Sequence, residues 1–121
     1  MRRDALRLQD IVEAADALAC YLRDLSQEQF LAGGLIQDAI LRQLTVVGEA
    51  AFKVSPELRE RRTEVPWMKI AGFRHRVVHD YFGLDLDAVW IIATREVPVL
   101  RAQVITILAS EFPPEADAPN E

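Results

Sequence analysis

Two long stretches of the chain carry apolar residues at helical spacing, and this pattern constrains the fold more than any other feature. In residues 8–25 the apolar positions recur every three or four residues, as on one face of a core-packed helix: Leu8, Ile11, Ala15, Leu18, Leu22 and Leu25. In residues 35–54 an apolar stripe is formed by Ile36, Ile40, Leu44, Val47 and Ala51. A polar stripe on another face contains Asp38, Arg42, Thr45 and Glu49. We therefore expect two long amphipathic helices.

Signals for helix ends mark the segments between them. Ser26, followed three residues later by Gln29, is typical of a capping box that opens a short turn. Ser55-Pro56 should end the second long helix, because the residue before a proline is pushed out of the helical region. Residues 57–64 follow as a predicted charged linker.

Further helices are expected in the second half of the chain. A proline at a first helical position opens a third helix from Trp67 to about Asp80. Asp85 or Asp87 supplies the cap of a fourth. The fourth segment, residues 88–110, contains Pro98, which removes a backbone hydrogen bond and clashes with the carbonyl four residues earlier. We expect a kink there, or two helices in series.

The predicted fold is all-α. No segment shows sustained period-two alternation bounded by hairpin turns, so we expect no β-sheet. The connections between the helices are short, which favours an antiparallel bundle of four to five helices within one domain, residues 1–110. Residues 111–121 hold four acids, three prolines and no base, and are predicted to form a flexible acidic tail. The single cysteine, Cys20, is expected in the core, and it excludes an intrachain disulfide.

The chain shows no pattern of export or membrane insertion. No stretch approaches the ~20 apolar residues of a membrane span. The first residues lack the uninterrupted apolar run of a signal peptide. We expect a cytoplasmic protein without a membrane partner.

The charge balance is acidic as a whole and basic in one place. The chain has 19 acids and 14 Lys and Arg residues, a net charge of −5, which argues against a broad nucleic-acid-coating surface. When the chain is divided into residues 1–52, 53–79, 80–110 and 111–121, the second segment, with seven bases and three acids, is the one with a positive balance. A small, focused phosphate-binding site is therefore compatible with the acidic whole.

The least typical stretch, residues 72–83, gathers both histidines, two arginines and one of the two tyrosines. A metal site is one interpretation, because His75 and His79 share a helix face as in H-E-x-x-H. Arg76, however, replaces the general-base glutamate, and no third histidine exists. We therefore expect neither a metal nor a cofactor.

Phosphate chemistry is the second interpretation. Arg74 and Arg76 offer bidentate phosphate donors beside imidazoles that act as acid or base near neutral pH. Cleavage of a phosphodiester needs a base for the attacking hydroxyl, an acid for the leaving oxygen and a cation for the developing charge. The third interpretation is structural, with surface arginines paired to acids such as Asp80 and one histidine inside the bundle.

One helix presents Arg74 and His79 poorly to a common substrate. Five residues apart, they point about 140° from each other. A second copy of the helix, brought alongside by a two-fold axis, would supply the missing partner.

The spacing of Arg74, His79 and Tyr81, with the polar His75 directly after the arginine, resembles the signature of the HEPN superfamily, specifically the HepT-type toxins of prokaryotic toxin–antitoxin pairs. The resemblance extends over about residues 4–109. The other matching segments are Gln37-Asp38-Ala39, Val47-Gly48-Glu49-Ala50-Ala51, Pro66-Trp67, Ile70-Ala71-Gly72, Tyr81-Phe82-Gly83 and Val89-Trp90.

The resemblance implies a homodimeric helical ribonuclease in which two motifs meet in one cleft and cut RNA without metal, leaving a cyclic phosphate. Arg74 and His79 would be the catalytic pair, with His75 orienting them. Glu49 would form a hydrogen bond near the cleft, and Arg76 would contact RNA.

The same resemblance implies a partner. A nucleotidyltransferase antitoxin of the MntA type would attach AMP to Tyr81 and silence the toxin. Asp80 departs from the small residue common at its position, and could pair with Arg76 or repel phosphate.

Two other functions stay open. The chain could be a catalytically silent module that binds a nucleotide or RNA and partners a nucleotidyltransferase. It could also be a structural dimerisation domain, given the apolar run Val89-Trp90-Ile91-Ile92.

Overall fold

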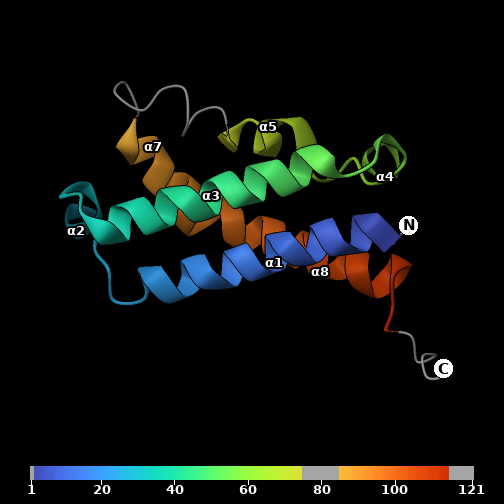
Figure 1. Ribbon diagram of the computed structural model, residues 1–121, viewed down its shortest axis with the longest axis horizontal. Coiled ribbons are helices and arrows are strands. Elements are labelled where there is room, and N and C mark those ends of the chain that lie inside the picture. The colour runs from blue at the N-terminus through green and yellow to red at the C-terminus, as the bar shows by residue number, and fades with distance from the viewer. Residues whose placement is uncertain (1, 75–84, 115–121) are drawn as a thin grey trace.

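The computed structural model describes residues 2–74 and 85–114, and every regular element within these residues is a helix (Figure 1). The α-helices are α1 (Arg2–Leu22), α2 (Gln27–Leu31), α3 (Leu35–Lys53), α4 (Pro56–Arg61), α5 (Trp67–Ala71), α7 (Leu86–Ile91) and α8 (Val97–Glu111). A π-helical turn, η2 (Ile92–Glu96), joins the last two. The prediction of an all-α fold is confirmed.

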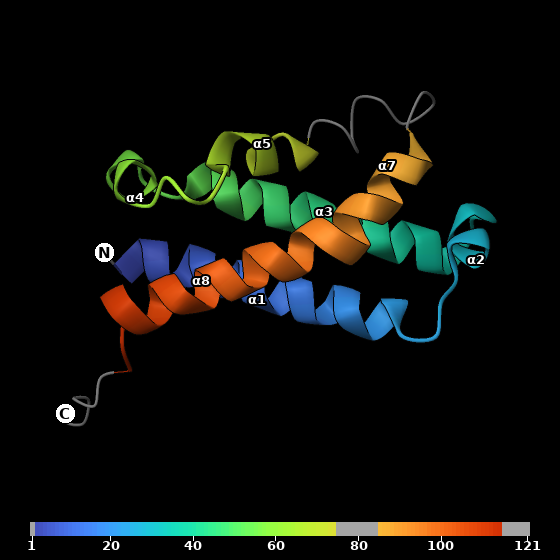
Figure 2. The same ribbon diagram turned by 180° about the vertical axis from the view of Figure 1, so that it is seen from behind.

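The long helices α1, α3 and α8 make the body of the molecule (Figures 1 and 2). α1 packs against both α3 and α8 and runs antiparallel to each, while α5 lies on α3 and α2 contacts α7. The predicted apolar stripes supply the fully buried side chains of the core, among them Leu8, Ile11, Leu18, Ile40, Leu44 and Val47. The two long helices are therefore confirmed, although α1 begins before residue 8 and ends three residues before Leu25.

The predicted charged linker after α3 is wrong, because residues 56–61 form the helix α4. Ser55 is its N-cap and accepts a hydrogen bond from the backbone nitrogen of Leu58 (3.2 Å). Ser55 also donates from its backbone nitrogen (2.9 Å) and its hydroxyl (2.6 Å) to the carboxylate of Asp4, which is 2% exposed. The Ser-Pro pair thus ends α3 and also starts the next helix.

The predicted helix from Trp67 to Asp80 is interrupted. α5 ends at Ala71, and the backbone N–H of Gly72 donates to the carbonyls of both Met68 and Lys69 (3.1 Å each). Phe73 and Arg74 are helical again, and residues 75–80 lie outside the described residues.

Pro98 is accommodated by helices in series, as expected. Asp85 caps α7 by accepting a hydrogen bond from the backbone nitrogen of Ala88 (3.1 Å). Pro98 is in the first turn of α8, and the wider π-helical turn η2 comes directly before it. Since proline disturbs the carbonyl four residues back, the irregular turn lies where the disturbance is expected.

Two smaller predictions are corrected. Cys20 is exposed rather than buried, because it lies on the α1 face away from the core. Glu111 does not belong to a free tail: it is the last residue of α8, and its carboxylate accepts hydrogen bonds from Arg61 (2.7 Å) and Arg62 (2.5 Å). These bonds hold the pKa of the Glu111 carboxyl below its ordinary value.

No helix in the described part of the chain is both long and apolar enough to cross a lipid bilayer.

Candidate active site

The backbone of α3 and the segment that carries Arg74 approach each other at Gly48. A Cβ atom placed on Gly48 would be 2.7 Å from the backbone nitrogen of Arg74 and 3.2 Å from the carbonyl oxygen of Ile70. Such distances leave no room for a side chain, so glycine is required for the close approach. The approach brings the Arg74 side chain onto the surface of α3.

Two side chains of α3 hold the Arg74 guanidinium. Its Nε is 3.9 Å from Oε1 of Glu49, an ion-pair distance that is too long for a hydrogen bond. Its Cζ is 4.0 Å from the centroid of the Phe52 ring, within the range of a cation–π interaction. Glu49 and Phe52 are three residues apart and therefore share a face of the helix.

The guanidinium is partly buried and retains donor capacity. The Arg74 side chain is 22% exposed, and its Nε is buried without a hydrogen-bond partner among the described residues. A buried donor of this kind is costly unless something accepts its hydrogen bond. An anion placed beside Arg74 would meet a cation that is already oriented.

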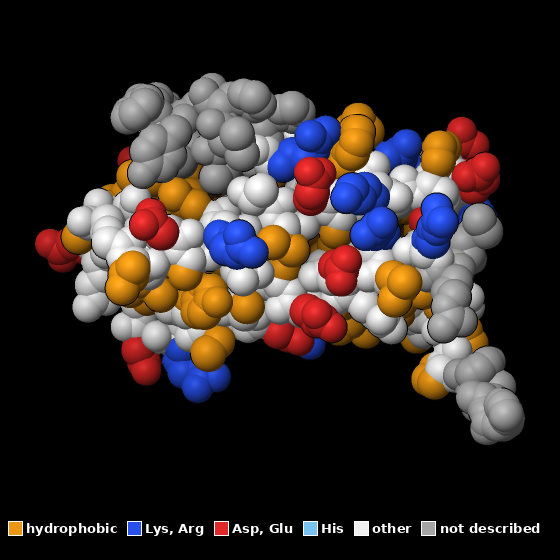
Figure 3. Space-filling model, in the orientation of Figure 1, with side chains coloured by type: hydrophobic (Ala, Val, Ile, Leu, Met, Phe, Trp, Pro, Cys, Tyr) orange, Lys and Arg blue, Asp and Glu red, His pale blue; other side chains and the backbone are white. Residues whose placement is uncertain are grey.

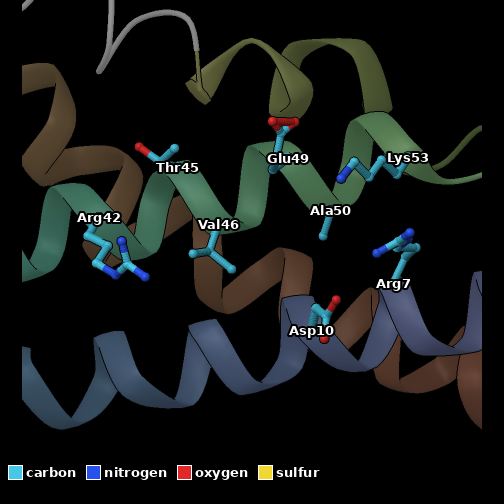
Figure 4. A pocket seen from close by; sticks show the side chains of 8 residues that line it. All are labelled: Arg7, Asp10, Arg42, Thr45, Val46, Glu49, Ala50 and Lys53. Atoms are coloured by element: carbon cyan, nitrogen blue, oxygen red, sulfur yellow. The ribbon is translucent and has the colours of Figure 1, made fainter.

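Glu49 also borders an open groove between α1 and α3, with a volume of about 390 Å³ (Figure 4). Glu49 points away from α1 and toward the ribbon of α5, whereas Arg7 and Asp10 point from α1 toward α3 (Figure 4). Figure 3 shows most of the Lys and Arg side chains on this face gathered over the C-terminal half of α3 and the elements next to it. The groove and the surroundings of Arg74 thus adjoin.

The other residues of the predicted site cannot be placed. His75, Arg76, His79 and Tyr81 lie outside the described residues, as does Asp80. Of the predicted site residues, Arg74 and Glu49 are described, and the structure brings them together. The alternative of a metal held by the two histidines also rests on residues outside the described ranges.

Two members of the Arg74 environment are not among the residues of the predicted site. Phe52 makes the cation–π contact with Arg74 although its side chain is 45% exposed. An aromatic residue on the polar side of an amphipathic helix is the sequence signal that could have identified it. Gly48 lies in the matching segment Val47–Ala51, and its packing role depends on a partner segment that helical periodicity does not reveal.

Comparison with known proteins gives a consistent assignment. A family model described as "Ribonuclease HepT-like" matches residues 11–107. The chain is 34% identical over 104 residues to a protein named "Putative RNase" from Caldanaerobacter subterraneus subsp. tengcongensis, covering 86% of this chain and 93% of the relative. It is 30% identical over 96 residues to a "Probable ribonuclease HepT" from Thermococcus cleftensis, covering 79% and 87%.

One relative is about twice as long as the region that it shares with this chain. The chain is 29% identical over 109 residues to a "Gamma-glutamylcyclotransferase and putative RNase" from Methanocaldococcus jannaschii, and the match covers 89% of this chain but 49% of that protein. No solved structure matches the chain significantly. The family match spans every described element from α2 to η2 and most of α1 and α8, including the Arg74 environment. The chain therefore belongs to the HepT-like ribonuclease family.

Proposed function

We propose that this protein is a metal-independent endoribonuclease that acts as the toxin of a toxin–antitoxin pair. The observation that carries the proposal is the state of Arg74, a partly buried guanidinium that is held by Glu49 and Phe52 and whose Nε has no hydrogen-bond partner among the described residues. Membership of the HepT-like ribonuclease family supports RNA as the substrate.

The proposed reaction is an internal transfer at phosphorus. The ribose 2′-hydroxyl attacks the adjacent phosphorus, its proton passes to a base, and the bond to the 5′-oxygen of the next nucleotide breaks as that oxygen receives a proton. The products are a 2′,3′-cyclic phosphate and a 5′-hydroxyl. His79 moves the protons, and Arg74 stabilises the charge that develops on the phosphoryl oxygens.

The active site is proposed to be composite. In a homodimer, two copies of the motif meet in one cleft, so that one His79 acts as base and the other as acid. His75 orients the catalytic pair, and Arg76 contacts the RNA backbone. Glu49 keeps the Arg74 guanidinium in place through charge attraction. The separation of 3.9 Å between Arg74 Nε and Glu49 Oε1 supports this role.

A cleavage assay in EDTA tests the enzymatic part. The wild-type protein should cut RNA with metal ions chelated, and Arg74→Ala and His79→Ala should each remove most of the activity. Arg95→Ala removes an exposed arginine from η2 and serves as a control that should cut normally. Activity that disappears in EDTA would contradict metal independence.

The toxin part needs a partner. We propose that a nucleotidyltransferase antitoxin transfers AMP from ATP to the phenolic oxygen of Tyr81, with release of pyrophosphate. Co-expression with such an enzyme should add the mass of one or more AMP groups and restore growth. Tyr81→Phe should stay unmodified and toxic, and a fully modified Tyr81→Phe protein would contradict the assignment.

The second candidate is a silent module that binds a nucleotide or RNA through the same cationic site. The ion pair with Glu49 favours it, because a carboxylate beside Arg74 offsets part of the positive charge that the nuclease needs to stabilise the charge developing on the phosphoryl oxygens. A silent module would bind RNA and leave it intact under all conditions of the cleavage assay.

A further inference from the structure

We propose that the groove between α1 and α3 binds the phosphate backbone of the RNA strand beyond the scissile bond. The inference deepens the proposed function, since it takes RNA as the ligand. The groove binds the strand, while cleavage takes place at Arg74 and His79.

Three cations line the groove from two helices. Arg7 lies on α1, and Arg42 and Lys53 lie on α3. Arg42 is at one end of the groove, and Arg7 and Lys53 are at the other (Figure 4). Arg42 and Lys53 are eleven residues apart on one helix, which places them about 16 Å apart along its axis. This length accommodates more than one phosphate group of an extended strand.

The cations are available to a ligand. Within the described ranges none of the three lies within 4.0 Å of a carboxylate oxygen, in contrast to Arg61, Arg62 and Arg101, which all form ion pairs. Of the two acids that line the groove, Glu49 is paired with Arg74, which leaves Asp10 as the opposing charge inside it. The groove therefore has a positive balance, which attracts a polyanion.

The remaining lining suits a backbone contact rather than recognition of bases. Val46 and Ala50 are apolar, and the hydroxyl of Thr45 already donates to the carbonyl of Leu41 (3.1 Å). Among the residues that the structure describes, no aromatic ring, Asn or Gln lines the groove to stack on a base or read its edge. Binding here is consequently independent of sequence, and specificity comes from the cleavage site.

The groove leads to the proposed site of cleavage. Glu49 borders the groove and also contacts the Arg74 guanidinium. A strand whose scissile phosphate lies beside Arg74 can continue along α3 past this residue. The groove is thus placed to bind nucleotides that flank the cut.

Binding of a labelled single-stranded 2′-O-methyl RNA tests the inference. This probe keeps the phosphates and lacks the attacking hydroxyl, so the wild-type protein can be used. The double variant Arg42→Ala/Lys53→Ala should bind several-fold more weakly in fluorescence anisotropy. The slope of log K against log salt should fall by about 1.4, because each phosphate contact of a single strand contributes about 0.7.

Matched variants separate a local effect from a change in net charge. Arg23→Ala/Arg95→Ala removes the same charge from exposed positions that do not line the groove, and should bind like the wild type. Asp10→Asn should bind RNA more tightly, whereas Glu28→Gln on α2 should not. Equal weakening by both double variants, or no gain from Asp10→Asn, would overturn the inference.

Kinetics distinguish this inference from the proposed function. On a long cleavable RNA, Arg42→Ala/Lys53→Ala should raise KM and leave kcat nearly unchanged, whereas cleavage of a dinucleotide should not change. Cleavage with unchanged KM, or a change in oligomeric state without a change in affinity, would overturn the groove assignment and leave the nuclease standing. RNA binding that depends on the groove in a protein that never cuts would support the groove and refute the nuclease.

Discussion

Gly48 and Arg74 are in such close contact that a Cβ atom on Gly48 would be 2.7 Å from the Arg74 backbone nitrogen. The neighbouring obstacles, the carbonyl oxygens of Ile70 and Ala71, are backbone atoms as well, at 3.2 and 3.3 Å. Backbone cannot rotate away as a flexible side chain can. The segment that carries Arg74 can therefore pack this closely against α3 because Gly48 has no side chain.

Gly48→Ala should destabilise the protein and reduce RNA cleavage. Alanine improves helix propensity by up to about 1 kcal/mol, but overpacking costs about 1–3 kcal/mol, so the net free energy of unfolding should fall. Urea unfolding followed by circular dichroism measures the first effect and a cleavage assay the second. Gln43→Ala, on the same helix, is the control that should change neither. A Gly48→Ala protein that is more stable than the wild type would show that the two segments are not in close contact.

Removing the ring beneath Arg74 should affect activity more than stability. Phe52 is 45% exposed, so Phe52→Ala loses little core packing, but it frees the guanidinium 4.0 Å above the ring. A cation–π interaction of about 0.5–1 kcal/mol corresponds to a two- to five-fold fall in kcat/KM. Phe52→Tyr keeps the ring face and should retain activity. Leu35→Ala removes another exposed apolar side chain from α3 and should have no effect. Equal activity of Phe52→Ala and Phe52→Tyr would contradict this role.

The sequence predicts the long helices because their signal is local. The stripes of α1 and α3 become buried as expected. The error at Cys20 has a geometric cause: two residues after the buried Leu18, it is turned about 200° around α1, beyond the core face. An apolar neighbourhood in sequence does not decide which face a residue occupies.

The missed features depend on partners distant in sequence. The helix α4 buries Leu58, and its N-cap is Ser55. Ser55 donates a hydrogen bond to the carboxylate of Asp4, which is 51 positions away in the sequence. Likewise, the motif predicts Arg74 as a site residue and the resemblance of the segment Val47–Ala51 predicts Glu49, yet their contact follows from the packing of two segments at Gly48. Residue types could be recognised from sequence, while the distances between them could not.

Asp4→Ala should destabilise the fold considerably. The Asp4 carboxylate is buried and accepts two hydrogen bonds from Ser55, and its loss leaves these donors unsatisfied at a cost of about 1–3 kcal/mol. Asp16, also on α1, forms an ion pair with Arg101 at the surface (2.7 Å), with side chains 55% and 41% exposed. Asp16→Ala should cost less than about 1 kcal/mol. Urea unfolding of the two variants should show this difference, and equal losses would contradict the buried role of Asp4.

The contact between Glu111 and the two arginines of the α4 region should make stability depend on pH. The hydrogen bonds from Arg61 and Arg62 lower the pKa of Glu111 in the folded protein. A carboxyl with a lowered folded pKa stabilises the protein above its unfolded pKa, about 4.3, and this contribution is lost as the pH falls through the folded value. Wild type and Glu111→Gln should therefore differ in free energy of unfolding at neutral pH and converge in acid.

Urea titrations across the acid range measure this convergence. Glu60→Gln is the control, because Glu60 is an exposed acid of α4 with no ion pair among the described residues. It should match the wild type at neutral pH, since it changes the charge of α4 without touching the contact at the end of α8. If Glu111→Gln unfolds like the wild type at neutral pH, or if the difference grows in acid, the ion pairs do not fasten the end of α8 to this region.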